Sequence, residues 1–136
     1  MIVADANLLA DLLLSTREAK IAEAVFAADP VWAAPLLWRS EFRSILAAYM
    51  RQRGMSLSEA WQAHELAEQL LVGREFTIGG EAVLRLVATS RCSAYDCEYV
   101  VLAQEVGAPL VTRDRQLLRE FPAVTVSPKV FVQSSA

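Results

Sequence analysis

The sequence predicts an α/β fold with a mainly parallel central sheet of about five strands and helices on both faces. Short apolar runs alternate with longer segments of helical periodicity along the whole 136-residue chain. Most of the short runs are apolar throughout, which is typical of strands covered on both faces and hence of a parallel sheet. Hydrophobic residues make up 54% of the chain, and no linker, internal repeat or low-complexity segment interrupts it. We therefore expect a single domain over residues 1–136.

The beginning of the chain predicts a strand, two helices and a second strand. Residues 1–5 open with an apolar run typical of a strand, and a leucine-rich helix is expected over residues 7–14. Residues 17–28 carry apolar side chains at helical spacing, and the Asp-Pro pair after them ends this second helix. The apolar run at residues 31–34 predicts the second strand.

Two longer helices and the third strand are expected next. The helical pattern of residues 36–53 stops at Gly54, and glycine commonly follows the last turn of a helix. Ser56 or Ser58 is suited to cap the following helix, which extends to about residue 71. Residues 75–78 predict the third strand.

The last part of the chain predicts three helices and two strands. In order, these are a helix over residues 80–91, a helix from Ser93 to Gly107, a strand at 109–112, a short helix at 115–120 and a strand at 124–126. The final residues, 133–136, are expected to form a frayed tail.

Composition argues against several classes of protein. The mean hydropathy of +0.30 argues against disorder, and charges within every apolar stretch leave no membrane span. A strand-like run at Met1 leaves no room for a signal peptide, so we expect a cytoplasmic protein. Cys92 and Cys97 fit neither a zinc-ligand pattern nor a disulfide framework, and we expect both to pack near a helix start. The single histidine, His64, is expected on the surface, which argues against a zinc enzyme or a Ser-His-Asp hydrolase.

Arginine dominates the basic residues, although the net charge of −3 does not by itself suggest a nucleic-acid-binding protein. Arginine is the better bidentate partner for phosphate, and several arginines flank acidic positions, namely Arg39, Arg43, Arg91, Arg113 and Arg115. An acidic metal pocket rimmed by arginine can hold a polyanion, because the metal inverts the local field. The alternative is that these are ordinary solvated helix charges, and it is the better one for any single arginine.

Four acidic residues stand where a carboxylate is hard to explain structurally, and two of them follow strands. Asp5 and Asp114 come directly after the first and fourth expected strands. Ligands of open parallel sheets bind beyond the carboxyl ends of the strands, so these two side chains are expected at the binding edge. Each could instead simply cap the helix that follows, and Asn7 could fill that role in place of Asp5.

The other two acids, Glu41 and Asp96, lie within expected helices. Glu41 flanks the apolar stripe of its helix, and Asp96 lies on or beside the buried arc of its own, where an unpartnered carboxylate is costly. A surface ion pair with an arginine is the alternative for Glu41, and a capping box with Ser93 is the alternative for Asp96. Converging carboxylates repel one another, and hard divalent cations relieve that repulsion. The four acids together indicate a metal-dependent enzyme that acts on phosphodiesters.

Four segments carry a resemblance to a known family: VADANLL at residues 3–9, SEF at 40–42, AYDCEYVVLA at 94–103 and PLVTRD at 109–114. Their order and spacing resemble those of PIN-domain ribonucleases, most closely the VapC toxins of bacterial type II toxin–antitoxin pairs. The resemblance covers essentially the whole chain. It implies a PIN-like three-layer fold and a metal-dependent endoribonuclease that serves as the toxin of such a pair.

The resemblance also implies the site. The acidic catalytic and metal-binding quartet would be Asp5, Glu41, Asp96 and Asp114, with Asn7 and Thr112 as supporting polar residues. The implied cofactor is Mg²⁺ or Mn²⁺, one ion being held by the first three acids, directly or through water. Asp114 would complete that site or help a second ion. The expected products of RNA hydrolysis are a 5′-phosphate and a 3′-hydroxyl.

The implied partners are RNA, a second copy of the chain in a homodimer, and a small antitoxin that lays a segment into an apolar groove near the active site. One leucine run is longer than a single helix face can bury, and part of it could meet a partner: Leu8, Leu9, Leu12, Leu13 and Leu14. Burial of the whole run beneath neighbouring helices is at least an equal alternative.

Three other functions stay open at this point. A phospho-receiver domain also gathers acids at strand ends, and Thr112 and Lys129 could supply its threonine and lysine, but it gives Glu41 and Asp96 no role. A PIN-like module that binds RNA or a partner without cutting is the second alternative. A nuclease acting on DNA is the third, because no residue visibly reads a 2′-hydroxyl.

Overall fold

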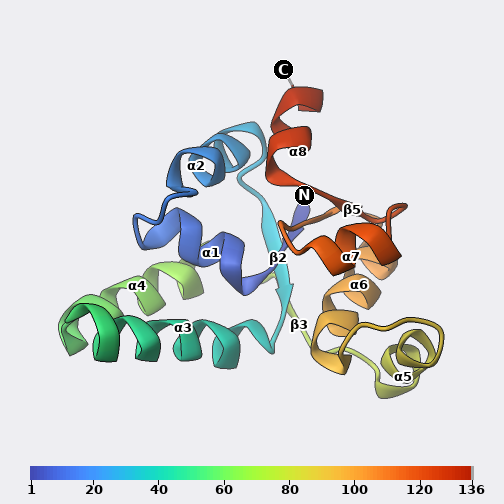
Figure 1. The fold of residues 1–136 in the computed structure, drawn as a ribbon, viewed down its shortest axis with the longest axis horizontal. Helices are drawn as coiled ribbons and strands as arrows, with labels where there is room; N and C mark the ends of the chain where they lie inside the picture. Colours follow the sequence, from blue (N-terminus) through green and yellow to red (C-terminus); the bar gives the residue numbers. More distant parts are fainter. Residues whose placement is uncertain (136) are drawn as a thin grey trace.

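A parallel sheet of five strands forms the centre of the computed structural model, which describes residues 1–135 (Figure 1). The strands are β1 (Ile2–Ala4), β2 (Trp32–Pro35), β3 (Glu75–Phe76), β4 (Leu110–Val111) and β5 (Thr125–Val126), in the order β3-β2-β1-β4-β5. Every pairing is parallel, and β1 lies in the middle, with Val3 paired to Ala33 on one side and to Leu110 on the other. The predicted fold class is confirmed.

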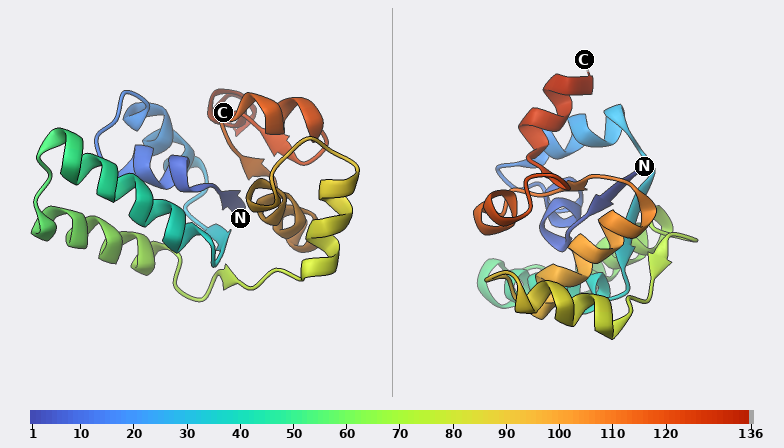
Figure 2. Two further views of the ribbon diagram at one scale, coloured as in Figure 1. Left: turned by 60° about the horizontal axis from the view of Figure 1, so that its bottom comes forward. Right: turned by 90° about the vertical axis from the view of Figure 1, so that its right-hand side faces the viewer.

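Helices cover both faces of this sheet. The eight helices of residues 1–135 are α1 (Ala6–Leu13), α2 (Ala19–Ala28), α3 (Trp38–Arg53), α4 (Leu57–Leu70), α5 (Gly80–Ala88), α6 (Ala94–Val106), α7 (Arg115–Glu120) and α8 (Pro128–Ser135). Helices α1 to α4 lie on one side, and α5, α6 and α7 lie on the other (Figure 1). Helices α3 and α4 run side by side as an antiparallel pair (Figure 2), and α8 packs against α2.

The apolar strands are buried because both faces of the sheet are covered. Every residue of β1 and β2 is buried, and the largest side chains of the core include Trp32, Trp38, Phe42 and Tyr99. The leucine run of α1 contributes to this core: Leu8 and Leu9 are buried, and Leu12, Leu13 and Leu14 are half-buried against it. Most of the leucine run therefore packs within the domain, which favours the alternative of burial beneath neighbouring helices over contact with a partner.

Local signals set the helix boundaries. Ser56, not Ser58, caps α4: its hydroxyl accepts from the backbone N–H of Glu59, and the Glu59 carboxylate accepts from the N–H of Ser56. Gly107 ends α6 with a φ of 65°, a left-handed conformation that favours glycine. Helix α5 ends at Ala88, earlier than the expected residue 91. Cys92 and Cys97 are both buried near the start of α6, as expected.

Two expectations are wrong. His64 is only 4% exposed, because its ring stacks against the indoles of Trp38 and Trp61 and bonds to charged groups on both edges. Residues 133–135 are not a frayed tail but the last turn of α8, which is held against α2. Ala136 lies outside the described residues.

Membrane insertion finds no support in the helices. Within residues 1–135, none of them combines the length and the apolar character that a bilayer crossing requires.

Candidate active site

The four acids singled out in the sequence line one pocket of about 290 Å³. Asp5 follows β1 and Asp114 follows β4, and these strands are parallel neighbours, so both side chains stand at the same edge of the sheet. Glu41 reaches the pocket from α3 and Asp96 from α6, on the two sides of the sheet. Asn7, in the first turn of α1, also lines the pocket.

Thr112 ties the two strand ends together. Its buried hydroxyl donates to Asp5 Oδ2 at 2.6 Å and accepts from the backbone N–H of Asp114 at 3.1 Å. Asp5 Oδ1 accepts from the N–H of Leu8 at 2.9 Å and so caps α1. Asp114 Oδ1 likewise caps α7 by accepting from the N–H of Leu117 at 3.0 Å. Both residues therefore cap helices and also line the pocket, so the interpretation as a helix cap and the interpretation as a site residue are compatible.

Burial disfavours the charge on Asp5. Desolvation raises the pKa of this carboxyl to about 6, against the opposing effects of the hydrogen bonds from Thr112 and Leu8 and of the positive charge on Arg113. A divalent cation in the pocket would favour the ionised form and reverse this penalty.

Glu41 and Asp96 are affected in the same direction. Burial raises the pKa of Glu41, and the charges of Asp96 and Glu98 add to the rise, while a hydrogen bond from Tyr99 opposes it. Burial also raises the pKa of Asp96, and the charge of Asp114 adds to it. The acids thus repel one another across a partly desolvated pocket, which is the electrostatic setting that binds cations.

The capping-box explanation for Asp96 holds only in part. The Ser93 hydroxyl accepts from the backbone N–H of Asp96 at 3.1 Å and caps α6. Among residues 1–135 the Asp96 carboxylate makes no return hydrogen bond to the Ser93 backbone, although a capping box requires one. The Asp96 side chain therefore lines the pocket and does not complete a capping box.

The donor set fits a hydrated hard cation better than a closed metal cage. No three carboxylate, histidine or cysteine groups in the described part of the chain lie close enough together to form a ready-made metal cluster. Mg²⁺ and related ions keep several waters and are commonly held by one or two carboxylates, so a ring of oxygen ligands around an open pocket suits them. The residues present therefore fit Mg²⁺ or Mn²⁺ bound partly through water.

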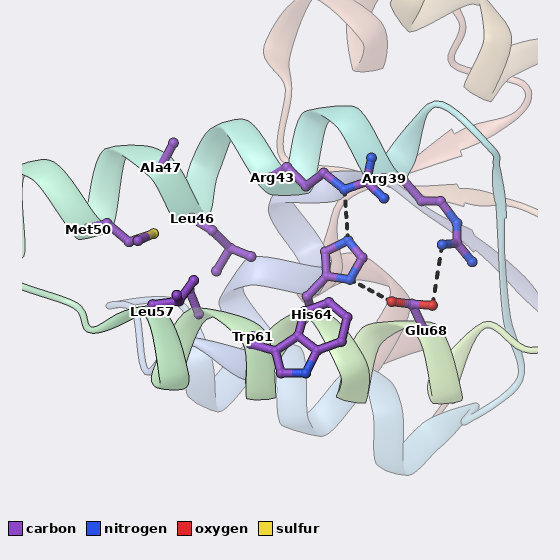
Figure 3. A pocket seen from close by; sticks show the side chains of 10 residues that line it. Arg39, Arg43, Leu46, Ala47, Met50, Leu57, Trp61, His64 and Glu68 are labelled. Atoms are coloured by element: carbon purple, nitrogen blue, oxygen red, sulfur yellow. Dashed lines mark hydrogen bonds and ion pairs between the residues drawn. The ribbon is translucent and has the colours of Figure 1, made fainter.

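Two of the flanking arginines do not rim this pocket. Arg39 and Arg43 lie on another face of α3 and line a separate groove between α3 and α4 (Figure 3). Arg39 pairs with Glu75 at 2.7 Å and Glu68 at 3.3 Å, and Arg43 donates to His64 at 3.2 Å. The expectation of an arginine rim is wrong for these two, because helical spacing turns positions 39 and 43 away from position 41.

Arg113 also has a structural partner. Its guanidinium forms two hydrogen bonds, of 2.9 and 3.1 Å, with the carboxylate of Asp11, which is 2% exposed. Arg91 and Arg115 are exposed. Ordinary charges and structural ion pairs thus account for most of the arginines, as expected for single residues.

Sequence reasoning missed two polar residues that line the pocket, Ser44 and Tyr99. The Tyr99 hydroxyl donates to Glu41 Oε1 at 2.6 Å. Its position three residues after Asp96 places it on the same face of α6, which was the available signal. Glu98, two residues after Asp96, is half-buried and lines a neighbouring apolar pocket with Leu36, Ile78 and Leu84.

Comparison with known families settles the membership of this fold. The family model described as "PIN domain" matches residues 2–123. The chain belongs to the PIN-domain family. This membership rules out the alternative of a phospho-receiver domain. In the structure the Thr112 hydroxyl donates a hydrogen bond to Asp5.

Individual proteins resemble this PIN domain to different degrees. "Ribonuclease VapC3" of Pyrobaculum aerophilum is 30% identical over an alignment of 92 residues, and the match covers 65% of this chain and 63% of that protein. The match therefore spans less than two thirds of the relative's length. Among solved structures, "Toxin-antitoxin complex from Klebsiella pneumoniae" superposes with a TM-score of 0.71 at 20% identity, covering 94% of this chain and 98% of that one. "Crystal Structure of FitAcB from Neisseria gonorrhoeae" gives a TM-score of 0.71 at 18% identity, covering 95% and 99%. At these identities the two structures establish the shared fold.

Proposed function

We propose that this protein is a metal-dependent endoribonuclease and the toxin of a type II toxin–antitoxin pair. The observation that carries the proposal is the set of four acids, from two strand ends and two helices, around one pocket. Membership of the PIN-domain family and the ribonuclease among its relatives support it. A toxin that cuts cellular RNA would act in the cytoplasm.

Asp5, Glu41 and Asp96 would hold one Mg²⁺ or Mn²⁺ ion, directly or through water, and Asp114 would complete the site or help a second ion. When bound, the ion lowers the pKa of a water ligand and stabilises charge that develops on the phosphate. The protein's own contribution is to fix the carboxylates. Thr112 holds Asp5 in place, and the helix cap at α7 holds Asp114. The expected products are a 5′-phosphate and a 3′-hydroxyl.

RNA is the proposed substrate, and the electrostatics of the pocket make metal a condition for binding it. Without a cation, the acids would repel the phosphate backbone, and the chain as a whole carries a net charge of −3. A bound divalent ion would reverse the sign of the local field at the scissile phosphate. Exposed arginines such as Arg91 and Arg115 would bind RNA phosphates without sequence preference, and this part of the affinity would fall as the salt concentration rises.

The groove between α3 and α4 is the proposed seat of an antitoxin segment. Its volume is about 480 Å³, and Leu46, Met50, Leu57 and Trp61 line its apolar part (Figure 3). Arg43, at the polar end, donates to the His64 ring and within residues 1–135 pairs with no carboxylate, so its charge is available to an acidic side chain. An amphipathic helix with one acidic residue fits this arrangement. Trp61→Ser should weaken capture of the antitoxin by at least tenfold, because an exposed indole is a typical hot spot.

A homodimer is proposed on the resemblance and on one exposed apolar face. Leu36 and Leu84 are exposed at the pocket that Glu98 also lines. Light scattering of the purified chain would give twice the monomer mass, and the Leu84→Asp variant would give the mass of a monomer. A wild-type monomer at high concentration would contradict this part of the proposal.

The proposed activity is tested by cleavage of a panel of tRNA and ribosomal RNA fragments. The purified, antitoxin-free chain is assayed with Mg²⁺, with Mn²⁺ and with chelator, and Asp96→Asn is compared with Glu105→Gln, an exposed acid on the same helix. Metal-dependent cutting that is lost in Asp96→Asn and kept in Glu105→Gln supports the proposal. Cutting of single-stranded DNA in place of RNA would favour the DNA-nuclease alternative. Binding of RNA without cutting in Mn²⁺ would favour the non-cleaving module.

A further inference from the structure

Tyr99 is a buried phenol whose only polar atom faces the acidic pocket. The residue is 2% exposed, and its ring packs in the hydrophobic core between the sheet and α6. The hydroxyl donates to Glu41 Oε1 at 2.6 Å, a short hydrogen bond of the charge-assisted kind. Tyrosines that pack in a core need only one partner for their hydroxyl, and here that partner is one of the four acids.

This contact joins two elements that are otherwise separate at the pocket. Glu41 belongs to α3 and Tyr99 to α6, and in residues 1–135 no other side-chain hydrogen bond links these two helices. Glutamate has three rotatable side-chain bonds, so an unheld Glu41 would sample several positions at the mouth of the pocket. The ring of Tyr99 is buried in the core, and its hydroxyl therefore restricts the position of one oxygen of the carboxylate.

Within residues 1–135 the Tyr99 hydroxyl has one hydrogen-bond acceptor, Glu41 Oε1. With Oε1 engaged, Oε2 of Glu41 has no hydrogen-bond partner among residues 1–135 and is left for the pocket. Thr112 holds Asp5 in the same manner, with a hydrogen bond of 2.6 Å to Oδ2.

We propose that Tyr99 is a positioning residue for the metal site, which holds Glu41 so that a single carboxylate oxygen is presented to the ion. This inference rests on the proposed function, because it assumes that Glu41 is a metal ligand. The hydroxyl acts through Glu41 and touches neither the ion nor the RNA. Outer-shell partners of this type commonly change metal affinity by about tenfold to a hundredfold when they are removed.

Tyr99→Phe tests the proposal, with Tyr95→Phe as the matched control. Tyr95 lies on the same helix, is 63% exposed and does not line the pocket. Mn²⁺ binding is measured directly, from the electron paramagnetic resonance signal of the free ion, together with circular dichroism of the metal-free protein. We expect Tyr99→Phe to weaken Mn²⁺ binding about tenfold with an unchanged fold, and Tyr95→Phe to bind as the wild type does. The Mn²⁺ concentration for half-maximal RNA cleavage should rise by the same factor.

A double-mutant cycle separates positioning from a merely structural role. If Tyr99 acts through Glu41, Tyr99→Phe has no further effect on Mn²⁺ binding when Glu41→Gln is already present. The same loss in both backgrounds, or no loss in the wild-type background, overturns the inference. It would leave the proposed function intact, since wild-type Mn²⁺ binding and RNA cleavage would still be observed. Absence of Mn²⁺ binding by the wild type would instead overturn the proposed metal site and the inference with it.

Discussion

Replacing Asp5 with asparagine should make the metal-free protein more stable at neutral pH, although the residue caps a helix. Burial raises the pKa of the Asp5 carboxyl from its usual 3.8 to about 6, so the folded state prefers the protonated form. The contribution of this carboxyl to stability is then largest below about pH 4, falls as the pH rises towards about 6, and stays low above it. At about 1.36 kcal/mol for each pKa unit, the ionised carboxylate lowers the free energy of unfolding by about 3 kcal/mol at neutral pH.

Asparagine removes that charge and keeps most of the geometry. Its amide oxygen can still accept from the N–H of Leu8, but the hydrogen bond from Thr112 is weakened. The loss of one such bond costs about 1 kcal/mol. The expected net gain for Asp5→Asn is therefore about 1–3 kcal/mol at about pH 7.5, and it disappears or changes sign at about pH 4.

Urea unfolding in the presence of chelator, followed by far-UV circular dichroism at the two pH values, measures this difference. Saturating Mn²⁺ should remove the advantage of Asp5→Asn, because the ion stabilises only the chain that binds it. A variant that is less stable than the wild type by the same amount at both pH values would contradict this pH dependence. The helix cap would then outweigh the desolvation of the carboxylate.

Three further substitutions test contacts away from the pocket. Arg113→Ala removes the charged partner of the buried Asp11 carboxylate, which keeps the hydrogen bond from Thr16, and should lower the free energy of unfolding by about 1–3 kcal/mol. Urea titration measures this loss, and an unchanged free energy of unfolding would show that the ion pair contributes nothing to stability. His64→Ala should lower the free energy of unfolding by about 2–4 kcal/mol in the same assay, because it leaves a cavity between two indoles and removes a hydrogen-bond partner of Arg43. A loss as small as that of a typical surface substitution would contradict the burial of His64. Glu75→Gln should lower the free energy of unfolding by about 1–3 kcal/mol at neutral pH, and by progressively less as the pH falls, since the hydrogen bond from Arg39 lowers the pKa of this carboxyl. An equal loss at acidic pH would show that the charge of Glu75 does not contribute to stability.

The fold was largely predictable because its signals are local. The apolar runs at β1 and β2 are apolar throughout because helices cover both faces, and Gly54 and Gly107 mark helix ends with a left-handed backbone. Helix α8 was missed because its short, polar-ended sequence has weak periodicity, and its stability comes from contact with α2.

The candidate site was predictable to the level of its acids. Asp5 and Asp114 follow strands, and the parallel order of β1 and β4 brings them to one edge, which the strand pattern alone could suggest. The side-chain contacts between distant segments could not be predicted from the sequence. The burial of His64 depends on the stacking of two indoles from α3 and α4, and the bond from Tyr99 to Glu41 joins residues 58 positions apart.

The proposed function depends on one divalent-metal site shared by Asp5, Glu41, Asp96 and Asp114. Anomalous diffraction from crystals soaked in Mn²⁺ locates bound ions directly. We expect an anomalous peak inside the pocket, within direct or water-mediated reach of Asp5, Glu41 and Asp96, and no such peak in Asp96→Asn. An empty pocket at Mn²⁺ concentrations that support RNA cleavage, or a peak only elsewhere on the protein, would contradict it.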